Sequence, residues 1–267
     1  MNCKICKNPV TKIFNARVLN KYSVDYFNCN NCGFVFTEKP YWLKEAYERP
    51  INLSDTGILQ RNISFSKILT AIIILNFNKS GRFLDYAGGY GIFTRLMRDI
   101  GFDFFWHDPY TQNIFANGFE SDSFSGQKYE LLTAFEVFEH LENPLDEIFK
   151  MKQLSDTIVF STEIIPDTIP QPGTWWYYGF EHGQHISFYS ERTLAYIAKQ
   201  FKLNHYRFDQ IHILSEKKIN SFLTRGYTNL NKIDLFKLLK RKLVSKTFID
   251  HENITNSVCK NNDSKSK

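Results

Sequence analysis

A short apolar segment that runs directly into a glycine cluster most constrains the fold of this chain. Residues 82–91 read RFLDYAGGYG, and residues 92–101 have the apolar spacing of a helix that stops at a glycine. Further apolar segments and one more helical pattern continue the alternation, at 102–108, 129–135, 139–154 and 157–163. Strands that alternate with helices predict an α/β fold, with a parallel sheet and helical crossovers on both of its faces.

Length and composition limit what else the chain contains. With 43% apolar and 23% charged residues it is globular, which excludes fibrous and wholly disordered proteins. Its 267 residues suffice for one α/β domain plus a small module. The patterns predict a zinc-binding module at 1–40, a helical connector or lid at 41–80, the α/β core at 81–214, a basic amphipathic arm at 215–249 and a disordered tail at 250–267.

The N-terminal residues MNCKICK are polar and basic, and no long apolar segment follows them, so no secretory signal is expected. The longest aliphatic run, residues 71–75, is far shorter than the ~20 residues that a membrane-spanning helix needs. It predicts a buried helix instead. We therefore expect the protein in the cytoplasm.

Four of the five cysteines form two C-x2-C pairs, Cys3 with Cys6 and Cys29 with Cys32. Each pair turns two thiolates toward one point, so two pairs complete a tetrahedral Zn²⁺ site. Disulfides are disfavoured in a reducing cytoplasm, and a redox C-x-x-C is disfavoured because two pairs occur outside a βαβ context. A four-thiolate site is coordinatively closed, so the zinc is expected to be structural and to fold the residues around it. Cys259, in the polar tail, is expected to be inert.

The glycine cluster has the spacing Asp85-x-Ala87-x-Gly89-x-Gly91, and Asp108 ends the next apolar segment. An acidic residue at that place can accept both hydroxyls of a cofactor ribose. A dinucleotide oxidoreductase is the leading competitor, but its G-x-G-x-x-G pattern would place glycine at 85 or 87.

The loop resembles the first motif of the class I S-adenosylmethionine (SAM)-dependent methyltransferases, roughly D-x-G-x-G-x-G, and departs from it at Ala87. Residues 133–144, TAFEVFEHLENP, are similar to the segment after the fourth strand in small-molecule members of that family, where E-V-x-E-H-x-x-x-P is common. The resemblance covers about 81–213 and implies a Rossmann-like sheet and SAM as cofactor. It implies these roles: Asp85 orients the methionine amino group, the loop 87–91 lies under the methionyl-ribose portion, Asp108 holds the ribose and Glu136 flanks the donor pocket.

Two more residues are candidates for the donor site. Asp122 lies where the family often places an acid that contacts the adenine, and a solvated loop acid is the alternative. Arg61 can pair with the donor carboxylate in a bidentate way, and an ordinary surface arginine is the alternative.

The acceptor site is predicted in residues 166–194, an irregular segment rich in proline, glycine and aromatic residues. Because histidine titrates near neutrality, His185 is the first candidate for a general base and His182 the second, with Glu181 to orient either imidazole. A structural role is the alternative for each histidine. Further candidates for contact with the acceptor are His140 and the aromatic side chains Trp175, Trp176 and Tyr178. Of these, Trp175 and Trp176 would suit stacking on a sugar ring.

The end of that segment, 185–194, resembles the H-x-S-x-x-S and helix of methyltransferases that act on nucleotide-linked deoxysugars and also carry an N-terminal four-cysteine module. Those relatives have an additional C-terminal domain that this chain lacks. The resemblance implies a small, sugar-like acceptor from a nucleotide-sugar or surface-glycan pathway.

The net charge of +5 is unevenly distributed, because residues 216–246 carry +7 and the rest of the chain −2. Residues 232–244 predict an amphipathic helix that packs on the protein, lies on an anionic membrane or contacts nucleic acid. An RNA methyltransferase that grips phosphates with the zinc module and this arm is therefore one alternative function, although the scarcity of basic residues elsewhere argues against nucleic acid. A non-catalytic binding protein, in which Ala87 marks a lost donor site, is the other.

Overall fold

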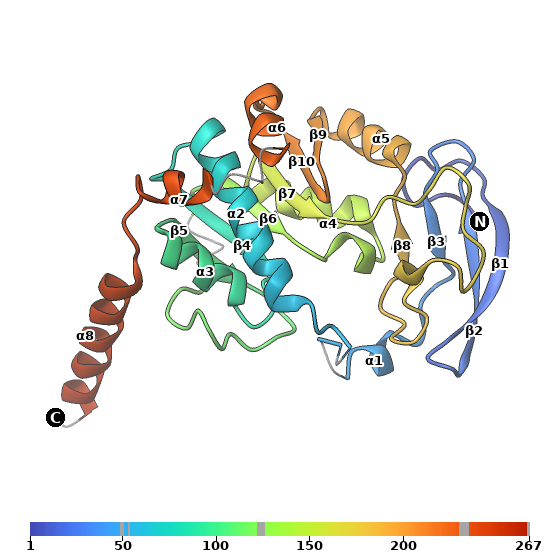
Figure 1. Ribbon diagram of the computed structural model, residues 1–267. Helices are drawn as coiled ribbons and strands as arrows, with labels where there is room; N and C mark the ends of the chain where they lie inside the picture. Colours follow the sequence, from blue (N-terminus) through green and yellow to red (C-terminus); the bar gives the residue numbers. More distant parts are fainter. Residues whose placement is uncertain (49–50, 53, 122–125, 230–234, 266–267) are drawn as a thin grey trace. The chain divides into compact units, whose positions relative to one another are not determined.

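A computed structural model gives the structure of the protein and describes residues 1–48, 51–52, 54–121, 126–229 and 235–265. Figure 1 labels its helices and strands. The chain divides into two compact units, each built from two separate stretches. The first unit joins Met1–Thr56 to Leu131–Ile219, and the second joins Gly57–Glu130 to Asn220–Lys267.

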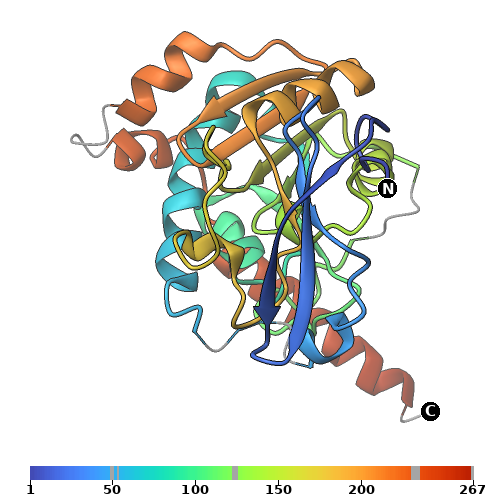
Figure 2. The same cartoon turned by 90° about the vertical axis from the view of Figure 1, so that its right-hand side faces the viewer.

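The N-terminal stretch forms a small antiparallel sheet of the order β1-β2-β3-β8, whose long β1–β2 hairpin is in front in Figure 2. Its strands are β1 (Thr11–Val18), β2 (Tyr22–Asn28), β3 (Val35–Thr37) and β8 (Ser187–Phe188). Because β8 comes from far along the chain, the segment predicted as a separate module shares its sheet with the segment predicted to bind the acceptor. The short helix α1 (Leu43–Ala46) follows β3.

One apolar core unites the two stretches of the first unit. Val24, Tyr26 and Val35 from the small sheet belong to the same buried cluster as Tyr178 and Phe188. Tyr26 packs edge-to-face on Tyr178, with ring centroids 5.9 Å apart. The small sheet therefore buries its apolar face against residues near the predicted acceptor segment, and does not depend on a core of its own.

The rest of the first unit alternates strands and helices. In chain order these are β6 (Leu131–Ala134), η1 (Phe138–His140), α4 (Pro144–Leu154), β7 (Thr157–Ser161), η2 (Trp176–Tyr178), α5 (Glu191–Phe201), β9 (Asn204–Phe208) and β10 (Ile211–Ser215). Ser190 caps α5 in a capping box with Thr193, which agrees with the helix start read from the sequence.

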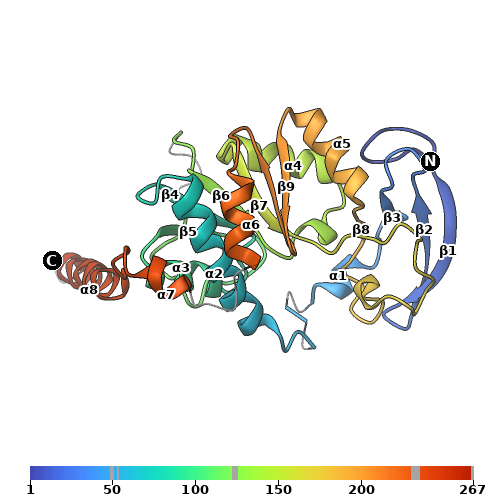
Figure 3. The same cartoon turned by 45° about the horizontal axis from the view of Figure 1, so that its top comes forward.

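The second unit carries the glycine cluster. Its elements are α2 (Ile58–Asn76), β4 (Arg82–Tyr86), α3 (Ile92–Ile100), β5 (Asp103–His107), α6 (Ser221–Asn229), α7 (Leu235–Lys240) and α8 (Thr247–Lys265). Helix α3 packs against β4 and β5, and α2 contacts α3, α6 and α7. Figure 3 labels α6, α7 and α8. Because α7 contacts α2, the basic arm packs on the protein, as one of the three predicted alternatives requires.

Hydrogen bonding gives the larger sheet the strand order β5-β4-β6-β7-β10-β9. The α/β fold is confirmed, and the predicted strands coincide with β4, β5, β6 and β7. The prediction of an entirely parallel sheet is wrong for β10, which runs antiparallel to both β7 and β9. A tight turn with Asp209 at φ 58° joins β9 to β10 and is too short for a parallel crossover.

Helix α2 contains the aliphatic run 71–75 and is the one helix of the described residues that is long and apolar enough to cross a membrane. Its mean hydropathy is 1.4, and 44% of the stretch is buried. Leu69, Ile72 and Ile73 are completely buried, as the sequence predicted for a core helix. The buried core helices of soluble proteins can also reach this length and hydropathy.

Helix α8 occupies residues for which composition predicted a disordered tail. Its first turn is fixed by Asp250, which accepts hydrogen bonds from Arg98 at 2.7 and 2.8 Å and from Arg95 at 2.9 Å. Arg98 and Asp250 are both nearly inaccessible to solvent. A polar sequence can thus hold a helix here because one buried ion pair anchors it. Cys259 lies in α8, beyond the side chains that the structure describes.

Candidate active site

The glycine loop between β4 and α3 has the left-handed backbone that its sequence predicts. Gly89 has φ 54° and Gly91 has φ 84°. A Cβ on Gly91 would come within 2.6 Å of Asn113 Oδ1 and 3.0 Å of the Ala116 Cβ, so only glycine fits there. Ala87, where the family has glycine, also has a positive φ of 55°. The loop keeps the conformation that glycine favours although one position has a methyl group.

Two acidic side chains hold this loop. Asp85, at the end of β4 and only 2% exposed, accepts a hydrogen bond of 2.9 Å from the Thr94 hydroxyl on α3. Asp108, just after β5, accepts the backbone N–H of Gly89 at 2.9 Å through Oδ2. Its Oδ1 accepts the N–H groups of Tyr110 and Thr111 at 2.8 and 3.0 Å. Both predicted carboxylates therefore lie at the carboxyl ends of parallel strands, where ligands of such sheets bind.

Trp106 gives the loop a further support, which the sequence reasoning missed. Its indole N–H donates to the carbonyl of Gly89 at 2.8 Å. A tryptophan at the next-to-last position of β5 has no distinctive sequence signal, because this chain uses aromatic residues throughout. With Asp108 and Trp106 on either side, the peptide at Gly89 is fixed before any ligand binds.

The other predicted donor residues are placed separately. Arg61 lies half-buried on α2, in the same unit as the loop. Asp122 lies outside the described residues. Glu136 belongs to the first unit, where its N–H donates to Ser161 Oγ at 2.8 Å and its carboxylate accepts from the same hydroxyl at 2.6 Å. Glu136 has a φ of 55°, and such strained residues cluster at functional sites.

The structure brings the three predicted histidines together in the first unit. The rings of His185 and His140 have centroids 5.0 Å apart, and those of His185 and His182 are 4.6 Å apart. His185 Nδ1 lies 2.6 Å from the Tyr177 carbonyl, and His140 Nδ1 lies 3.1 Å from the Gln184 carbonyl. Because a carbonyl only accepts, these contacts assign the proton to Nδ1 and the lone pair to Nε2 of each ring. His140 Nδ1 also lies 3.0 Å from the Tyr47 hydroxyl, which acts as an acceptor in this tautomer.

His182 has the opposite arrangement. Its Nδ1 accepts the backbone N–H of Gln184 at 3.1 Å, so the neutral ring carries its proton on Nε2. His182 thus has no second lone pair for an acceptor, and His140 and His185 are better placed to take a proton. Glu181 is exposed. Burial lowers the pKa of His182, and the charge of Glu181 opposes this effect without cancelling it.

Burial keeps these imidazoles neutral. It lowers the pKa of His140 to about 4, with a smaller contribution from His182. Burial also lowers the pKa of His185 well below its usual value, and the neighbouring histidines act in the same direction. At physiological pH both rings are therefore unprotonated and present a lone pair.

Glu139 is a site residue that the sequence analysis passed over. It is completely buried, and one ligand atom each of Glu139, His140 and His185 lies within 4.8 Å of the others. Burial and the charge of Glu139 raise the pKa of Tyr177 and Tyr189 well above the usual value. The sequence indicates Glu139 only through its position directly before His140, which places both side chains on one short helical turn.

Of the aromatic side chains predicted to contact the acceptor, one lies on the surface and the others pack in or against the core. Trp176 is 74% exposed and can offer its face to a ligand. Trp175 packs against Tyr178, with ring centroids 5.0 Å apart, and Tyr178 is only 1% exposed with its hydroxyl donated to the Pro170 carbonyl. Tyr178 was predicted to contact the acceptor, but its ring is part of the core and presents no face to a ligand.

The four cysteines of the N-terminal module converge as their spacing predicts. Their sulfurs all lie within 4.8 Å of one another, with 3.6 Å between Cys3 and Cys32 and 3.3 Å between Cys6 and Cys29. Tetrahedral zinc with Zn–S bonds of about 2.3 Å needs sulfurs about 3.8 Å apart, so the cluster fits that metal with little adjustment. The hydrogen bond between Cys3 and Cys32 lowers the pKa of Cys3 and raises the pKa of Cys32, so that without metal the pair favours one thiolate and one thiol.

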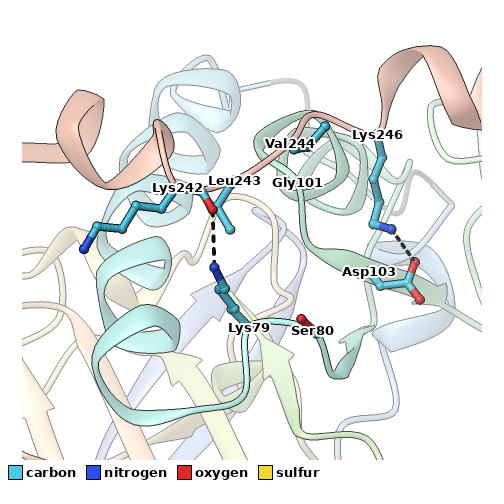
Figure 4. Close-up of a pocket in the computed structure, with 8 residues that line it drawn as sticks. All are labelled: Lys79, Ser80, Gly101, Asp103, Lys242, Leu243, Val244 and Lys246. Atoms are coloured by element: carbon cyan, nitrogen blue, oxygen red, sulfur yellow. Dashed lines mark hydrogen bonds and ion pairs between the residues drawn. The ribbon is translucent and has the colours of Figure 1, made fainter.

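A cavity of about 360 Å³ in the second unit involves none of these residues (Figure 4). It lies where the segment after α7 passes the start of β5, and it is lined in part by Lys79, Lys242 and Lys246. Lys79 Nζ donates to the Lys242 carbonyl at 3.4 Å, and Lys246 lies 3.6 Å from Asp103. These contacts hold the arm in place.

Residues 60–206 match the family described as "Methyltransferase domain", which is more than half of the chain. The chain belongs to the methyltransferase domain family. The SAM-dependent methyltransferase domain thus includes β4, the glycine loop and Asp108, and extends through the histidine cluster.

Solved structures with similarity to this methyltransferase are distant. One is CalO1, a methyltransferase of calicheamicin biosynthesis, in its SAH-bound form, at 10% identity and TM-score 0.44 over 66% of this chain and 60% of that one. Another is the magnesium protoporphyrin IX methyltransferase ChlM from Synechocystis PCC 6803, at 17% identity and TM-score 0.41 over 66% of this chain and 94% of ChlM. This chain thus spans less than two thirds of CalO1. No curated protein matches the chain.

Proposed function

We propose that the protein transfers the methyl group of SAM to a hydroxyl group of a small polar acceptor, namely a sugar of a nucleotide-sugar or surface-glycan pathway. The observation that carries the proposal is the glycine loop fixed by Asp108 in a chain of the methyltransferase domain family. Asp85 and Asp108 would bind the methionine amino group and the ribose of the donor.

The transfer is an in-line displacement. An acceptor oxygen forms a bond to the methyl carbon while the carbon–sulfur bond breaks, and the bonding pair goes to sulfur, so that the sulfonium becomes a neutral thioether. The hydroxyl proton must leave, and the Nε2 lone pairs of His140 and His185 supply a place at which it can be removed. Trp176 would offer a flat exposed face to a sugar ring.

The sugar acceptor is supported by the resemblance at 185–194, where His185, Ser187 and Ser190 keep the H-x-S-x-x-S spacing. Both serines have structural roles: Ser187 donates to the Leu141 carbonyl at 2.6 Å and Ser190 caps α5. They hold β8 itself and the start of α5, and thereby the backbone next to His185.

We also propose that the four cysteines hold a structural Zn²⁺ in a protein of the reducing cytoplasm. The N–H of Ile5 donates to Cys3 Sγ at 3.4 Å, and the amide of Asn8 lies 3.5 Å from Cys6 Sγ. Such donors stabilise thiolates that bind a metal. Four thiolates close the coordination shell, so this metal has no open position for a reactant.

The test is transfer of labelled methyl groups from SAM to a panel of nucleotide-sugars by the zinc-loaded protein. His185→Ala is expected to lower the rate by about 100-fold or more and to leave SAM binding unchanged. His205→Ala is the matched control in β9 and is expected to keep the rate. An RNA acceptor in parallel tests the alternative: labelled RNA with no labelled sugar would contradict the proposed acceptor.

A further inference from the structure

Three side chains of metal-binding type converge in the first unit, and they are separate from the four cysteines. Glu139, His140 and His185 each present one ligand atom, all within 4.8 Å of one another. We propose that they form a second metal site, for a divalent first-row transition cation. The inference rests on the proposed function and deepens it, since it assigns what activates the acceptor hydroxyl.

The imidazoles are oriented as metal ligands usually are. In metal sites the ring nitrogen that does not bind the metal typically donates its N–H to a carbonyl or carboxylate, which fixes the tautomer. His185 donates from Nδ1 to the Tyr177 carbonyl at 2.6 Å, and His140 from Nδ1 to the Gln184 carbonyl at 3.1 Å. Two Nε2 lone pairs therefore remain, one on each ring.

Glu139 supplies the negative charge of the site. It has no solvent-accessible surface, and a buried carboxylate is stabilised when a cation lies beside it. A divalent cation held by the same two rings would place a positive charge beside this carboxylate.

The three ligands are held by a rigid frame. Glu139 and His140 are on η1, and His185 lies just before β8. The Ile186 N–H donates to the Glu139 carbonyl at 2.8 Å, and the Tyr189 hydroxyl donates to the Phe138 carbonyl at 2.9 Å. These bonds tie the turn with two ligands to the segment with the third, so that the site needs little rearrangement.

Two histidines and one carboxylate are a ligand set that suits Zn²⁺, Mn²⁺ and Fe²⁺, and three protein ligands leave open coordination positions. An acceptor hydroxyl in an open position would have its pKa lowered by the cation and would release its proton to water. The resulting alkoxide then attacks the methyl carbon of SAM, and the carbon–sulfur pair goes to sulfur as before. In this scheme His185 holds the cation and does not itself take the proton.

The test is a titration with Mn²⁺ of protein that holds only one Zn²⁺ per chain, the equivalent that the four thiolates bind most tightly, observed as the loss of the free Mn²⁺ signal in electron paramagnetic resonance. Mn²⁺ is a hard cation with the lowest affinity of the first-row series, so it does not displace zinc from four thiolates. We expect one Mn²⁺ per chain, bound at least about tenfold more weakly by Glu139→Gln and by His185→Ala. The control His205→Ala should bind like the wild type.

A measurement on the wild-type protein covers the case in which these variants do not fold. Bound Mn²⁺ should broaden the ring nitrogen resonances of His140 and His185 much more than those of His205 and His212. No binding of Mn²⁺, binding unchanged by Glu139→Gln, or broadening confined to other histidines would overturn the proposal.

Failure of the metal site and failure of the proposed function are distinguishable. If SAM binds and methyl transfer proceeds but no Mn²⁺ binds, the metal site is overturned and the methyltransferase stands, with an imidazole as the base. If Mn²⁺ binds as expected but SAM does not, the metal site stands and the methyltransferase function is contradicted.

Discussion

The donor loop is controlled by single residues with unusual backbone angles. Ala87, Gly89 and Gly91 all have positive φ, although only two of them are glycine. An L-residue in the left-handed region costs about 1–2 kcal/mol, so Ala87 is held there by its surroundings. Asp108 and Trp106 fix the backbone of Gly89, two residues further along the same loop.

Replacement of Ala87 by glycine should therefore relieve strain. We expect Ala87→Gly to raise the free energy of unfolding by up to about 1 kcal/mol and to leave SAM binding at least as tight. Gly91→Ala is the contrasting variant, because its new Cβ would contact Asn113 Oδ1 at 2.6 Å in a left-handed backbone. Thermal unfolding of both variants checks this, and a destabilised Ala87→Gly would show that the loop is not strained.

The elements that carry the glycine loop could be predicted from the sequence. Hydrophobic periodicity indicates β4, α3 and β5, and Gly101 marks the end of α3. Asp85 and Asp108 could be found for the same reason: the ends of parallel strands define their place. The pairing of β8 with β3 and the antiparallel β10 could not, because long-range strand pairing leaves no local pattern. Glu139 was missed because the spacing of the histidines drew the inference to 181–185.

Helix α8 is the element that depends most on one contact. Burial by itself raises the pKa of Asp250, but hydrogen bonds and charges from Arg98 and Arg95 outweigh it and hold that pKa below its usual value. The lowered pKa means that the ion pair stabilises the folded state above the unfolded carboxyl pKa of about 3.9. This contribution is lost as the pH falls through the still lower pKa of the folded state.

Asp250→Asn should detach α8 from α3. We expect a loss of about 3 kcal/mol at pH 7, because Arg98 keeps a buried charge without its main partner, and faster amide exchange at the start of α8. The difference from the wild type should shrink as the pH falls below about 3.9. An exchange rate that does not change at pH 7 would contradict the role of this pair.

At the scale of the whole molecule, the zinc module and the acceptor segment depend on each other. The backbone carbonyl of Cys32 accepts hydrogen bonds from Ser190 and Thr193, at 3.2 and 2.9 Å. With the shared core and the β3–β8 pairing, these bonds tie the module to the backbone next to His185. The donor loop, by contrast, belongs to the other unit.

Removal of zinc should consequently affect the two halves of the reaction differently. We expect a strong chelator to disorder the small sheet and slow methyl transfer about tenfold or more, while SAM binding to the Gly57–Glu130 stretch persists. Metal analysis, circular dichroism and calorimetry on the same sample measure these three quantities. Full transfer activity in zinc-free protein would contradict the coupling.

Donor binding tests the central claim most directly. SAM titrated into the zinc-loaded protein in a calorimeter should bind one molecule per chain, and Asp108→Ala should weaken it by about tenfold to 100-fold, as expected when a hydrogen bond to a charged group is lost. Lys128→Ala, a change on the surface of the same unit, should leave it unchanged. No SAM binding, or binding that Asp108→Ala does not affect, would contradict the account.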